Sequence, residues 1–558
     1  MQPLLSNRFS VGAVFRSFVR SAMGAGLVLG ALAAAAAQPA AADTAIDISP
    51  VEVRRVPSEL PVGWQHGAFM EIFVRAYKDS NGDGIGDLKG VTQSLDYLKD
   101  LGITGIWLMP ITTNADCDHG YATTDFRGID PAYGTLVDFD ELIAQAHQRG
   151  IGVIMDYVIN HSAAEHPMFV SAKTGPSSPF YDWYVWEKTA PTGWDIWGKN
   201  PWTQTDQGAF FGTFGPHMPD FNFRNPAVLA YHQSSLRFWL NRGLDGYRLD
   251  AVPHLVANSA KEWNDQPESR RITRDLRALI TAYPQRYVVC EATANPQIYA
   301  APELCGSAFA FGLEKHFGQA ARGDRKSIQA VADYFKTAPQ SMATFASNHD
   351  IFAGPRLWDQ VKGNIAQYKL AAASYLLLPG TPFIYYGEEI GLAGLRGMEG
   401  DAPIRGPMSW TADVPGAGFT TGAPFRAIAP NVKQQNAAAQ VADPTSIHAF
   451  YKRMLKLRNA YSSLASGSYG ASFVYAKTLS FQRTLGTETT LVVINYATQP
   501  MRVKVPALPA RAVLTAAGTQ SAADNATTPV RANAKGIVQI RLPAQSVRVY
   551  TLTVPSSL

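Results

Sequence analysis

The chain contains little cysteine: three residues in 558, at positions 117, 290 and 305. This excludes the class of small domains that disulfides hold together, and a chain of this length buries enough surface to fold without them. No spacing of Cys and His resembles a zinc site. Cys290 lies in an apolar stretch and is predicted to be a buried thiol. Whether Cys117 pairs with Cys305 stays open.

A strong excess of one charge is also lacking. The 49 basic and 45 acidic residues give a net charge of +4, and three of the arginines fall in the first 42 residues, which hold no acid. The remaining chain is therefore close to neutral. Proteins that bind nucleic acid by electrostatics carry a large basic excess, so nucleic acid is not an expected partner.

One apolar stretch stands out, at residues 21–37, and it is short for a membrane span. Three arginines precede it, and the small residues 40–42 follow it. This order is typical of a secretory signal peptide, predicted here at 1–42, whereas a retained membrane anchor is the alternative. We expect cleavage, no membrane anchor afterwards, and a periplasmic or secreted protein.

Between about 68 and 464, short β-type runs alternate with segments of helical periodicity. Such alternation predicts parallel strands joined by crossover helices. The number of repeats favours a (β/α)8 TIM barrel, with a weak sixth strand near 307–313. The predicted strands are 69–77, 105–109, 153–159, 244–250, 287–291, 342–347 and 382–386, and the predicted helices are 88–101, 139–149, 225–242, 268–282, 325–337, 364–378 and 445–464.

Two segments interrupt the alternation. Residues 162–222 lack a helical period and contain five Trp, and 391–444 form a long loop after the last strand. Long loops in compact enzymes are usually functional. From about 470 the pattern becomes that of antiparallel strands. The predicted organisation is a signal peptide (1–42), an N-terminal segment (43–64), the barrel's first part (65–161), an inserted domain (162–222), the barrel's second part (223–465) and a C-terminal antiparallel β-sandwich (466–558).

Aromatic residues make up 11% of the chain. They serve equally well in large cores and in sugar-binding clefts. The inserted segment concentrates Trp183, Trp186, Trp194, Trp197 and Trp202. We expect most of these to pack the insertion and one or two to reach the substrate.

Three predicted barrel strands end in a carboxylate: Asp250, Glu291 and Asp350. Because active sites of such barrels lie at the carboxyl ends of the strands, these side chains are expected to converge. Glycoside cleavage requires two carboxyl groups, one as nucleophile and one as proton donor. Arg248 lies two residues before Asp250, on the same face of its strand. A guanidinium there favours the ionised carboxylate, and a buried ion pair with Asp156 is its structural alternative.

These segments resemble, in order, the signatures of the α-amylase family, glycoside hydrolase family 13. The resemblance covers about 65–558. It includes the loop His119-Gly120-Tyr121 with Asp125, a fifth segment at 218–222 between the oligo-1,6-glucosidase and neopullulanase forms, and segments 405–410 and 417–422 typical of bacterial amylases of this intermediate group. The four main segments are Asp156–His161, Gly246–Asp250, Glu291 and Asn348–Asp350.

The resemblance implies a role for each matched residue. Asp250 becomes the nucleophile, Glu291 the general acid and base, and Asp350 the carboxylate that binds the hydroxyls of the distorted sugar. The remaining substrate-binding residues implied by the family are His119, Tyr121, His161, Arg248, His254 and His349. One position departs from many α-amylases, since Pro253 stands where a lysine precedes the histidine, which leaves the product pattern open.

Oxygen side chains recur at nearly every second position of the loop 79–87. An EF-hand begins in the same way, because Ca²⁺ needs several close oxygens, but its closing Glu is replaced by Gly90. Similar loops in the family bind calcium, and a solvated turn is the alternative. The resemblance implies Ca²⁺ bound by Asp79, Asn81, Asp83, the carbonyl of Ile85, and Asp87.

The leading hypothesis is an exported retaining α-amylase, monomeric, that hydrolyses α-1,4 bonds of starch-type glucans and maltooligosaccharides. An α-glucosidase, or a transglycosylase or isomerase similar to trehalose synthase or cyclomaltodextrinase, would use the same carboxylates. A non-catalytic carbohydrate-binding protein on the same barrel is a third class. Retention of all three carboxylates argues against it.

Overall fold

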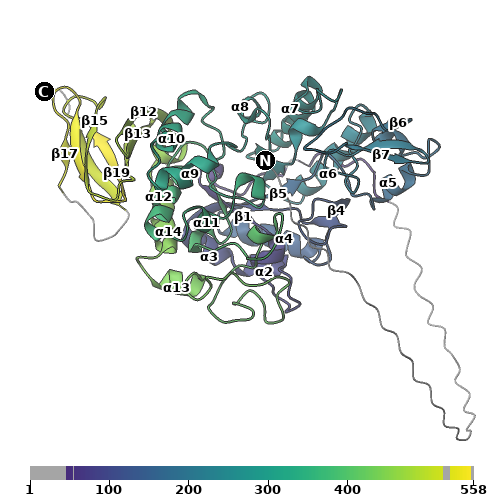
Figure 1. The fold of residues 1–558 in the computed structure, drawn as a ribbon, viewed down its shortest axis with the longest axis horizontal. Helices are drawn as coiled ribbons and strands as arrows, with labels where there is room; N and C mark the ends of the chain where they lie inside the picture. The colour runs from purple at the N-terminus through teal and green to yellow at the C-terminus, as the bar shows by residue number, and fades with distance from the viewer. Residues whose placement is uncertain (1–45, 55, 520–527, 555–558) are drawn as a thin grey trace, which may run out of the picture. The chain divides into compact units, whose positions relative to one another are not determined.

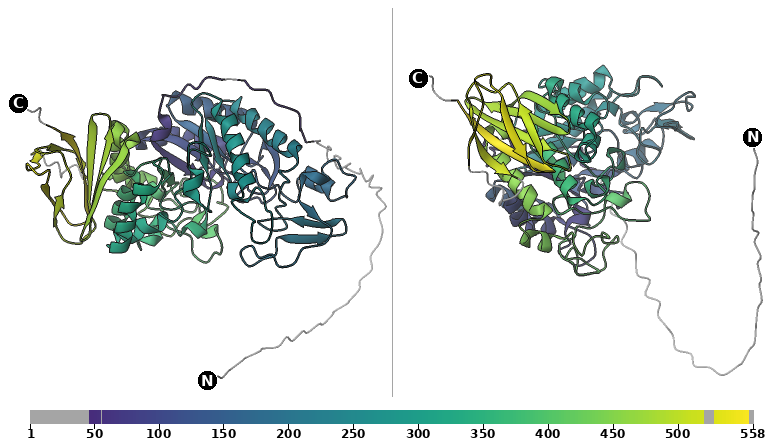
Figure 2. Two further views of the ribbon diagram at one scale, coloured as in Figure 1. Left: turned by 90° about the horizontal axis from the view of Figure 1, so that it is seen from above. Right: turned by 60° about the vertical axis from the view of Figure 1, so that its left-hand side comes forward.

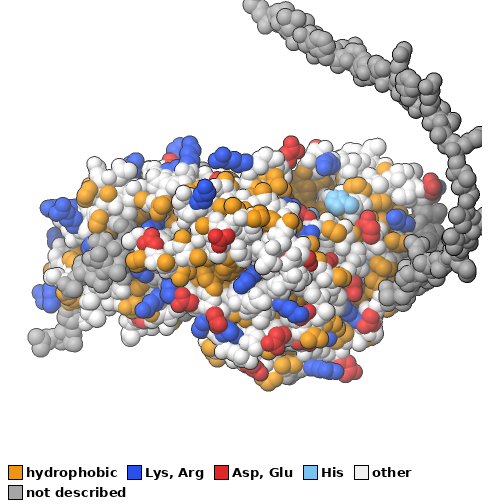
Figure 3. Space-filling view, turned by 90° about the horizontal axis from the view of Figure 1, so that it is seen from below, with side chains coloured by type: hydrophobic (Ala, Val, Ile, Leu, Met, Phe, Trp, Pro, Cys, Tyr) orange, Lys and Arg blue, Asp and Glu red, His pale blue; other side chains and the backbone are white. Residues whose placement is uncertain are grey.

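The computed structural model describes residues 46–54, 56–519 and 528–554 (Figure 1). The predicted signal peptide at 1–42 lies outside these residues. In the part of the chain that is described, no helix is long and apolar enough to cross a membrane. On the face drawn in Figure 3, basic and acidic side chains are interspersed.

Six parallel strands form one sheet in the order β10-β9-β5-β2-β1-β11. Successive strands of this sheet are parallel and are joined by at least one helix, as crossover connections require, and β11 pairs with β1, the first strand of the chain. The strands are almost entirely buried, which is why they read as continuous apolar runs. Their bounds are β1 (Ala68–Ile72), β2 (Ile103–Leu108), β5 (Gly152–Tyr157), β9 (Gly246–Leu249), β10 (Tyr287–Cys290) and β11 (Phe383–Tyr385).

The six strands belong to a barrel of eight positions. At the sixth and seventh positions, isolated β-bridges take the place of full strands. The sequence predicts a weak sixth strand and a full seventh strand at 342–347, whereas the structure has only single-residue parallel pairs there. These pairs close a ring of eight and confirm the TIM barrel. They join Cys290 to Ala308, Phe309 to Ala343, and Thr344 to Pro382, the last immediately before β11.

Aromatic side chains fill the barrel interior. The ring centroids of Phe69 and Phe383 lie 4.9 Å apart, and those of Trp107 and Phe309 lie 5.3 Å apart. Gly105 of β2 makes room for this packing, since a Cβ there would lie 2.5 Å from the ring of Phe69. Much of the aromatic excess therefore belongs to the core.

Helices cover the outside of the ring (Figures 1 and 2). Two predictions were wrong in detail. The strand predicted at 69–77 ends at Ile72 and continues as a short helix. The helix predicted at 88–101 is broken at Ser94, whose hydroxyl donates to the Gly90 carbonyl (2.9 Å) and competes with the helical hydrogen bonds. The helices are α1 (Val74–Tyr77), α2 (Leu88–Gln93), α3 (Leu95–Leu101), α4 (Leu136–Gln148), α6 (Pro226–Leu240), α7 (Pro267–Thr281), α8 (Pro296–Tyr299), α9 (Glu314–Ala321), α10 (Arg325–Thr337), α11 (Leu357–Gln360), α12 (Ile365–Leu376), α13 (Ala437–Ala442), α14 (Ile447–Ala460) and α15 (Ser462–Ser466).

The loops after the second and third barrel strands carry their own structure. The first contains an antiparallel hairpin that the sequence analysis missed. The Trp-rich segment contains helix α5 (Pro167–Ala172) and a three-stranded antiparallel sheet in the order β6-β8-β7. The strands concerned are β3 (Thr112–Asn114), β4 (Thr123–Ile129), β6 (Trp186–Glu187), β7 (Trp202–Thr205) and β8 (Gly208–Phe211).

The C-terminal region consists of two antiparallel sheets, one in the order β12-β13-β14-β19-β16-β17 and one of β15 and β18. Residues from both sheets, including Val493 and Ile540, share one buried apolar cluster, as in a sandwich. The first sheet lies beside α10 and α12 (Figure 2), where the Tyr469 hydroxyl donates to the Ala332 carbonyl at 2.9 Å. The strands are β12 (Ser468–Tyr475), β13 (Thr478–Leu485), β14 (Glu488–Asn495), β15 (Met501–Val505), β16 (Val513–Thr519), β17 (Val530–Arg531), β18 (Val538–Leu542) and β19 (Ser546–Thr553).

Candidate active site

Three carboxylates stand at the carboxyl ends of barrel strands and line one cleft of about 700 Å³. Asp250 directly follows β9, and Glu291 directly follows β10. Asp350 follows the seventh barrel position. The same cleft is lined by four of the predicted substrate-binding residues: His119, Tyr121, His161 and His254.

Arg248 lies behind these carboxylates with its side chain only 2% exposed. One amino group of its guanidinium contacts Asp156 at 2.9 Å and also binds Asp250 directly. The other contacts Glu291 Oε2 at 3.1 Å. One cation therefore holds both carboxyl groups of the predicted catalytic pair, and the alternative ion pair with Asp156 is present as well.

Burial and charge set the protonation of Glu291. Burial raises its pKa above the ordinary range, Arg248 opposes that rise, and the neighbouring Asp250 adds to it. The backbone N–H of Ala251 donates to Glu291 Oε2 at 3.0 Å, which favours the ionised form. Since burial is the largest cause, the net direction is upward, as a proton donor at neutral pH requires.

Asp350 is held by Arg405, a residue to which the sequence analysis assigned no role. Arg405 Nη2 lies 3.2 Å from Asp350 Oδ1 and 3.1 Å from Asp401, and its Nε donates to the His349 carbonyl at 2.9 Å. Burial raises the pKa of Asp350 to about 7, against the lowering effect of Arg405. The sequence offered one signal for a role of Arg405, the family-like segment 405–410. That segment does not show which carboxylate Arg405 contacts.

His349 is fully buried and links Glu71 to the cleft. Its Nδ1 lies 2.6 Å from Glu71 Oε1, and its Nε2 lies 2.7 Å from the Tyr121 hydroxyl and 3.1 Å from Asp350. Burial raises the pKa of Glu71 well above its usual range and lowers the pKa of His349. A protonated Glu71 that donates to a neutral His349 fits both directions, and it leaves the Nε2–H to donate to the Tyr121 hydroxyl or to Asp350. Glu71, on β1, carried no signature in the sequence.

Tyr121 and two further histidines form one wall. The Tyr121 hydroxyl donates to Asp156 Oδ2 at 2.9 Å. His161 Nε2 lies 3.2 Å from the Tyr121 carbonyl, and burial lowers the pKa of His161 to about 3. His119 Nδ1 accepts the Tyr121 N–H at 3.1 Å. Neutral imidazoles suit sugar hydroxyls, because each offers one donor and one acceptor.

An aromatic group surrounds His254 at one end of the cleft. Its ring stacks on Trp263 with centroids 5.4 Å apart, and it meets Trp197 and Phe214 edge-on. Trp197 is 61% exposed and is the one Trp of the inserted segment among the residues lining this cleft. Trp194 and Trp202 instead pack against each other at 5.9 Å, Trp183 is buried, and Trp186 stacks on Phe169, so four of the five inserted tryptophans pack within the protein.

The predicted calcium loop lies away from the cleft, against residues 419–425. Asp79 accepts N–H groups of Gly82 and Gly84 at 2.7 and 2.8 Å, and Asp87 accepts those of Ser80 and Gly90 at 2.9 and 2.7 Å. Three carboxylates, an amide oxygen and a carbonyl are hard donors that suit Ca²⁺. Within the described ranges, however, no three His, Cys, Asp or Glu side chains gather closely enough to hold a metal ion. Calcium at this loop stays a prediction.

One cysteine prediction was wrong. Cys290 is buried but is not a thiol, because it forms a disulfide with Cys305. Cys117 is the partner that was considered for Cys305, and it is free and exposed. The sequence could not reveal the pairing, because it depends on how the chain turns back to the barrel after β10.

Comparison with known proteins points to the same fold. A family model described as "Alpha amylase, catalytic domain" matches residues 71–467. Alpha-amylase 3 of Dictyoglomus thermophilum is 34% identical over 421 residues, or 72% of this chain and 79% of that protein. A trehalose synthase/amylase of Mycolicibacterium smegmatis is 32% identical over 474 residues, or 75% and 79%. The solved structure of an α-amylase from H. orenii matches with a TM-score of 0.75 and 30% identity, over 88% of this chain and 100% of that one. The chain belongs to the α-amylase family, glycoside hydrolase family 13, whose enzymes act on α-glucosidic bonds.

Proposed function

We propose that this protein is a retaining hydrolase of internal α-1,4 bonds in starch-type glucans and maltooligosaccharides. The observation that carries the proposal is the pair Asp250 and Glu291, held by the two amino groups of one guanidinium at the ends of adjacent strands. Such close placement suits retention, in which the carboxyl groups stand about 5–5.5 Å apart and leave no room for an attacking water between them.

In the first step, Asp250 attacks the anomeric carbon while Glu291 donates its proton to the glycosidic oxygen. The C–O bond to the leaving chain breaks, and a glycosyl ester forms on Asp250. Arg248 binds Asp250 and orients it for the attack. Asp350 lines the cleft and is placed to bind hydroxyls of the distorted sugar and to stabilise the developing positive charge, and the buried His349 contacts it from behind.

In the second step, ionised Glu291 takes a proton from water, and the resulting hydroxide displaces Asp250. If a sugar hydroxyl enters in place of water, the same site transfers or isomerises. The similarity to a trehalose synthase/amylase keeps this second candidate open, as does Pro253 beside His254 on the leaving side.

Product analysis tests the choice. Maltoheptaose and soluble starch are incubated with the protein, and the anomeric configuration of new reducing ends is followed by NMR. Shorter maltooligosaccharides that appear first as α-anomers support the proposal. Trehalose from maltose, or longer chains as main products, would assign an isomerase or transglycosylase instead, and first products of β configuration would exclude retention.

We also propose that calcium binds the loop 79–87 and that the protein is exported. Five oxygen donors in one short loop support the first. The second is supported by the signal-peptide pattern at 1–42 and by the Cys290–Cys305 disulfide, since disulfides persist mainly in oxidising compartments. A bound ion would stabilise the loop rather than touch the reacting atoms.

A further inference from the structure

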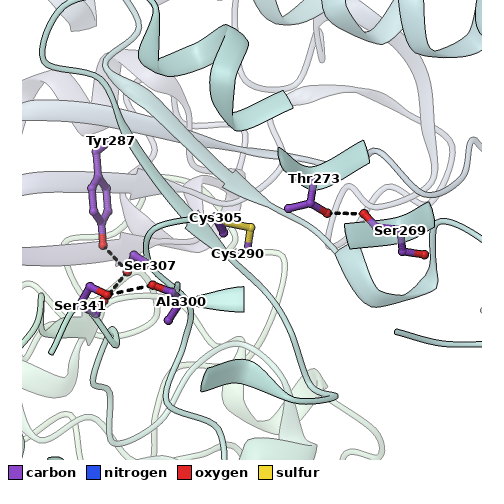
Figure 4. Close-up of a disulfide and its surroundings, with 8 residues drawn as sticks. All are labelled: Ser269, Thr273, Tyr287, Cys290, Ala300, Cys305, Ser307 and Ser341. Atoms are coloured by element: carbon purple, nitrogen blue, oxygen red, sulfur yellow. Dashed lines mark hydrogen bonds between the residues drawn. A yellow bond between two sulfur atoms is a disulfide. The ribbon is translucent and has the colours of Figure 1, made fainter. Parts of the chain in front are cut away.

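The Cys290–Cys305 disulfide lies next to the predicted proton donor in the chain. Cys290 is the last residue of β10, and Glu291 is the next residue in the chain. Both cysteines are buried, with 0% and 1% of their surface exposed. The bond closes a loop across a sequence separation of 15 residues (Figure 4).

The barrel wall at this point is one of three joints in the ring that consist of a single bridge. On one side, β10 pairs with β9 along its whole length. On the other side, the ladder is reduced to the single bridge between Cys290 and Ala308. The Cys290 N–H donates to the Ser307 carbonyl at 3.0 Å, and the Phe309 N–H donates to the Cys290 carbonyl at 3.2 Å. On the β9 side the Glu291 N–H donates to the Leu249 carbonyl at 2.9 Å, but on the Ala308 side the strand ladder ends at Cys290 and does not hold the chain that follows.

The backbone hydrogen bonds within the loop between the two cysteines are mainly local. It contains α8, a single helical turn, and its backbone bonds include Ala300 to Pro296 and Cys305 to Tyr299, both at 3.0 Å. Thr293 of this loop lines the cleft beside Glu291. A chain of side-chain hydrogen bonds fastens the far end to the barrel, from Tyr287 through Ser307 and Ser341 to the Ala300 carbonyl (Figure 4).

We propose that the Cys290–Cys305 disulfide is a positioning element that holds Glu291, and the cleft-lining loop after it, in the geometry needed for proton donation. The proposal rests on the proposed function, because it concerns the general acid. The covalent link replaces the strand ladder that is missing between the fifth and sixth barrel positions.

Loss of the disulfide should change the reaction rate because it changes the pKa of Glu291. The charged or titratable groups that face Glu291 are Arg248, Asp250, His254 and Asp350. Burial is the largest cause of its raised pKa. When the loop loosens and admits water, that cause weakens and the pKa falls. The alkaline limb of the pH–rate profile then moves to lower pH, because the acid must be protonated.

Thiol counting is the first test. Under denaturing conditions without reductant, the full chain should show one reactive thiol, that of Cys117, and Cys117→Ser should show none. Three thiols in the wild-type protein overturn the proposal at once.

Kinetics of Cys305→Ala, made in the Cys117→Ser background, is the second test. This change removes the link but leaves the Cys290 side chain next to Glu291 in the chain. Maltoheptaose needs a protonated leaving oxygen, whereas α-maltosyl fluoride does not. We expect kcat on maltoheptaose to fall more than about ten-fold further than kcat on the fluoride, since general acids contribute about 10²–10⁴-fold. KM should change little, and the alkaline limb should shift downward.

Two results contradict the proposal. A lower melting temperature with an unmoved alkaline limb, and equal losses on both substrates, would assign the disulfide a purely structural role. Glu291→Gln separates this failure from failure of the proposed function. If that variant still cleaves maltoheptaose like the wild type, the acid is another residue, and both proposals fall. If Cys305→Ala does not fold, the same kinetic measurements on Cys290→Ala decide whether the proposal stands.

Discussion

Removal of the Arg405 charge is the sharpest test of how the site controls its third carboxylate. Arg405 is 3% exposed on its side chain and contacts Asp350 at 3.2 Å. It opposes the burial that raises the pKa of Asp350 to about 7. Arg405→Met keeps most of the side-chain length but leaves Asp350 without this cation.

The size of the effect follows from the contact. At 3.2 Å and an effective dielectric of about 20, two unit charges attract by about 5 kcal/mol. A nearby opposite charge lowers a carboxyl pKa by about 1–3 units. From a starting pKa of about 7, a rise of that size reduces the ionised fraction at pH 7 from about one half to between about a tenth and a thousandth.

We therefore expect kcat/KM at pH 7 to fall by about five-fold to 500-fold if ionised Asp350 is required. The acid limb of the pH–rate profile should move upward by the same number of units, because the carboxylate then forms only at higher pH. The assay is kcat/KM on maltoheptaose across the stable pH range, with the fold checked by near-ultraviolet circular dichroism.

Two variants control this experiment. Arg405→Lys keeps the positive charge, so the acid limb of its pH–rate profile should lie close to that of the wild type. Arg426→Met removes a neighbouring arginine that pairs with Asp118 at 2.7 Å, and it should leave the limb in place. A loss of activity that is the same at every pH, with an unmoved acid limb, would refute the reasoning.

Four further predictions follow from named contacts. Asp250→Asn should lower kcat by several orders of magnitude while maltoheptaose binding, measured by calorimetry, survives, because the amide is nearly isosteric with the nucleophile; near-normal turnover would exclude the assignment. Glu291→Gln should lose the alkaline limb and cleave α-maltosyl fluoride far better than maltoheptaose, and equal losses would point to another acid. Burial raises the pKa of Glu388 from 4.5 to about 7, so the folded state should lose about 3 kcal/mol between these two values as pH rises; Glu388→Gln should flatten the pH dependence of the melting temperature, and an unchanged slope would contradict this. Chelation should lower the melting temperature, Asp83→Ala should weaken that response, and a metal-free protein that melts unchanged on adding calcium would rule out the loop as a calcium site.

Local pattern was enough to predict the scaffold of the site. The apolar runs before Asp250 and Glu291 revealed buried parallel strands, and a barrel places the ends of such strands at one mouth. The two-residue spacing of Arg248 and Asp250 predicted that both face the same side, since strand side chains alternate. These features depend on neighbours in sequence, and the structure brings them together as expected.

Partners distant in sequence were decided only by the tertiary structure. Glu71 meets His349 across 278 positions, and Arg405 meets Asp350 across 55. Neither pairing leaves a periodic trace, because each joins parts of the barrel that are far apart in the chain. The Cys290–Cys305 bond has the same origin, since an apolar strand alone predicts a buried thiol. The sequence thus determined which carboxylates are predicted to carry the chemistry, and the closure of the barrel decided which partners hold them, because only closure brings the ends of remote strands within contact distance.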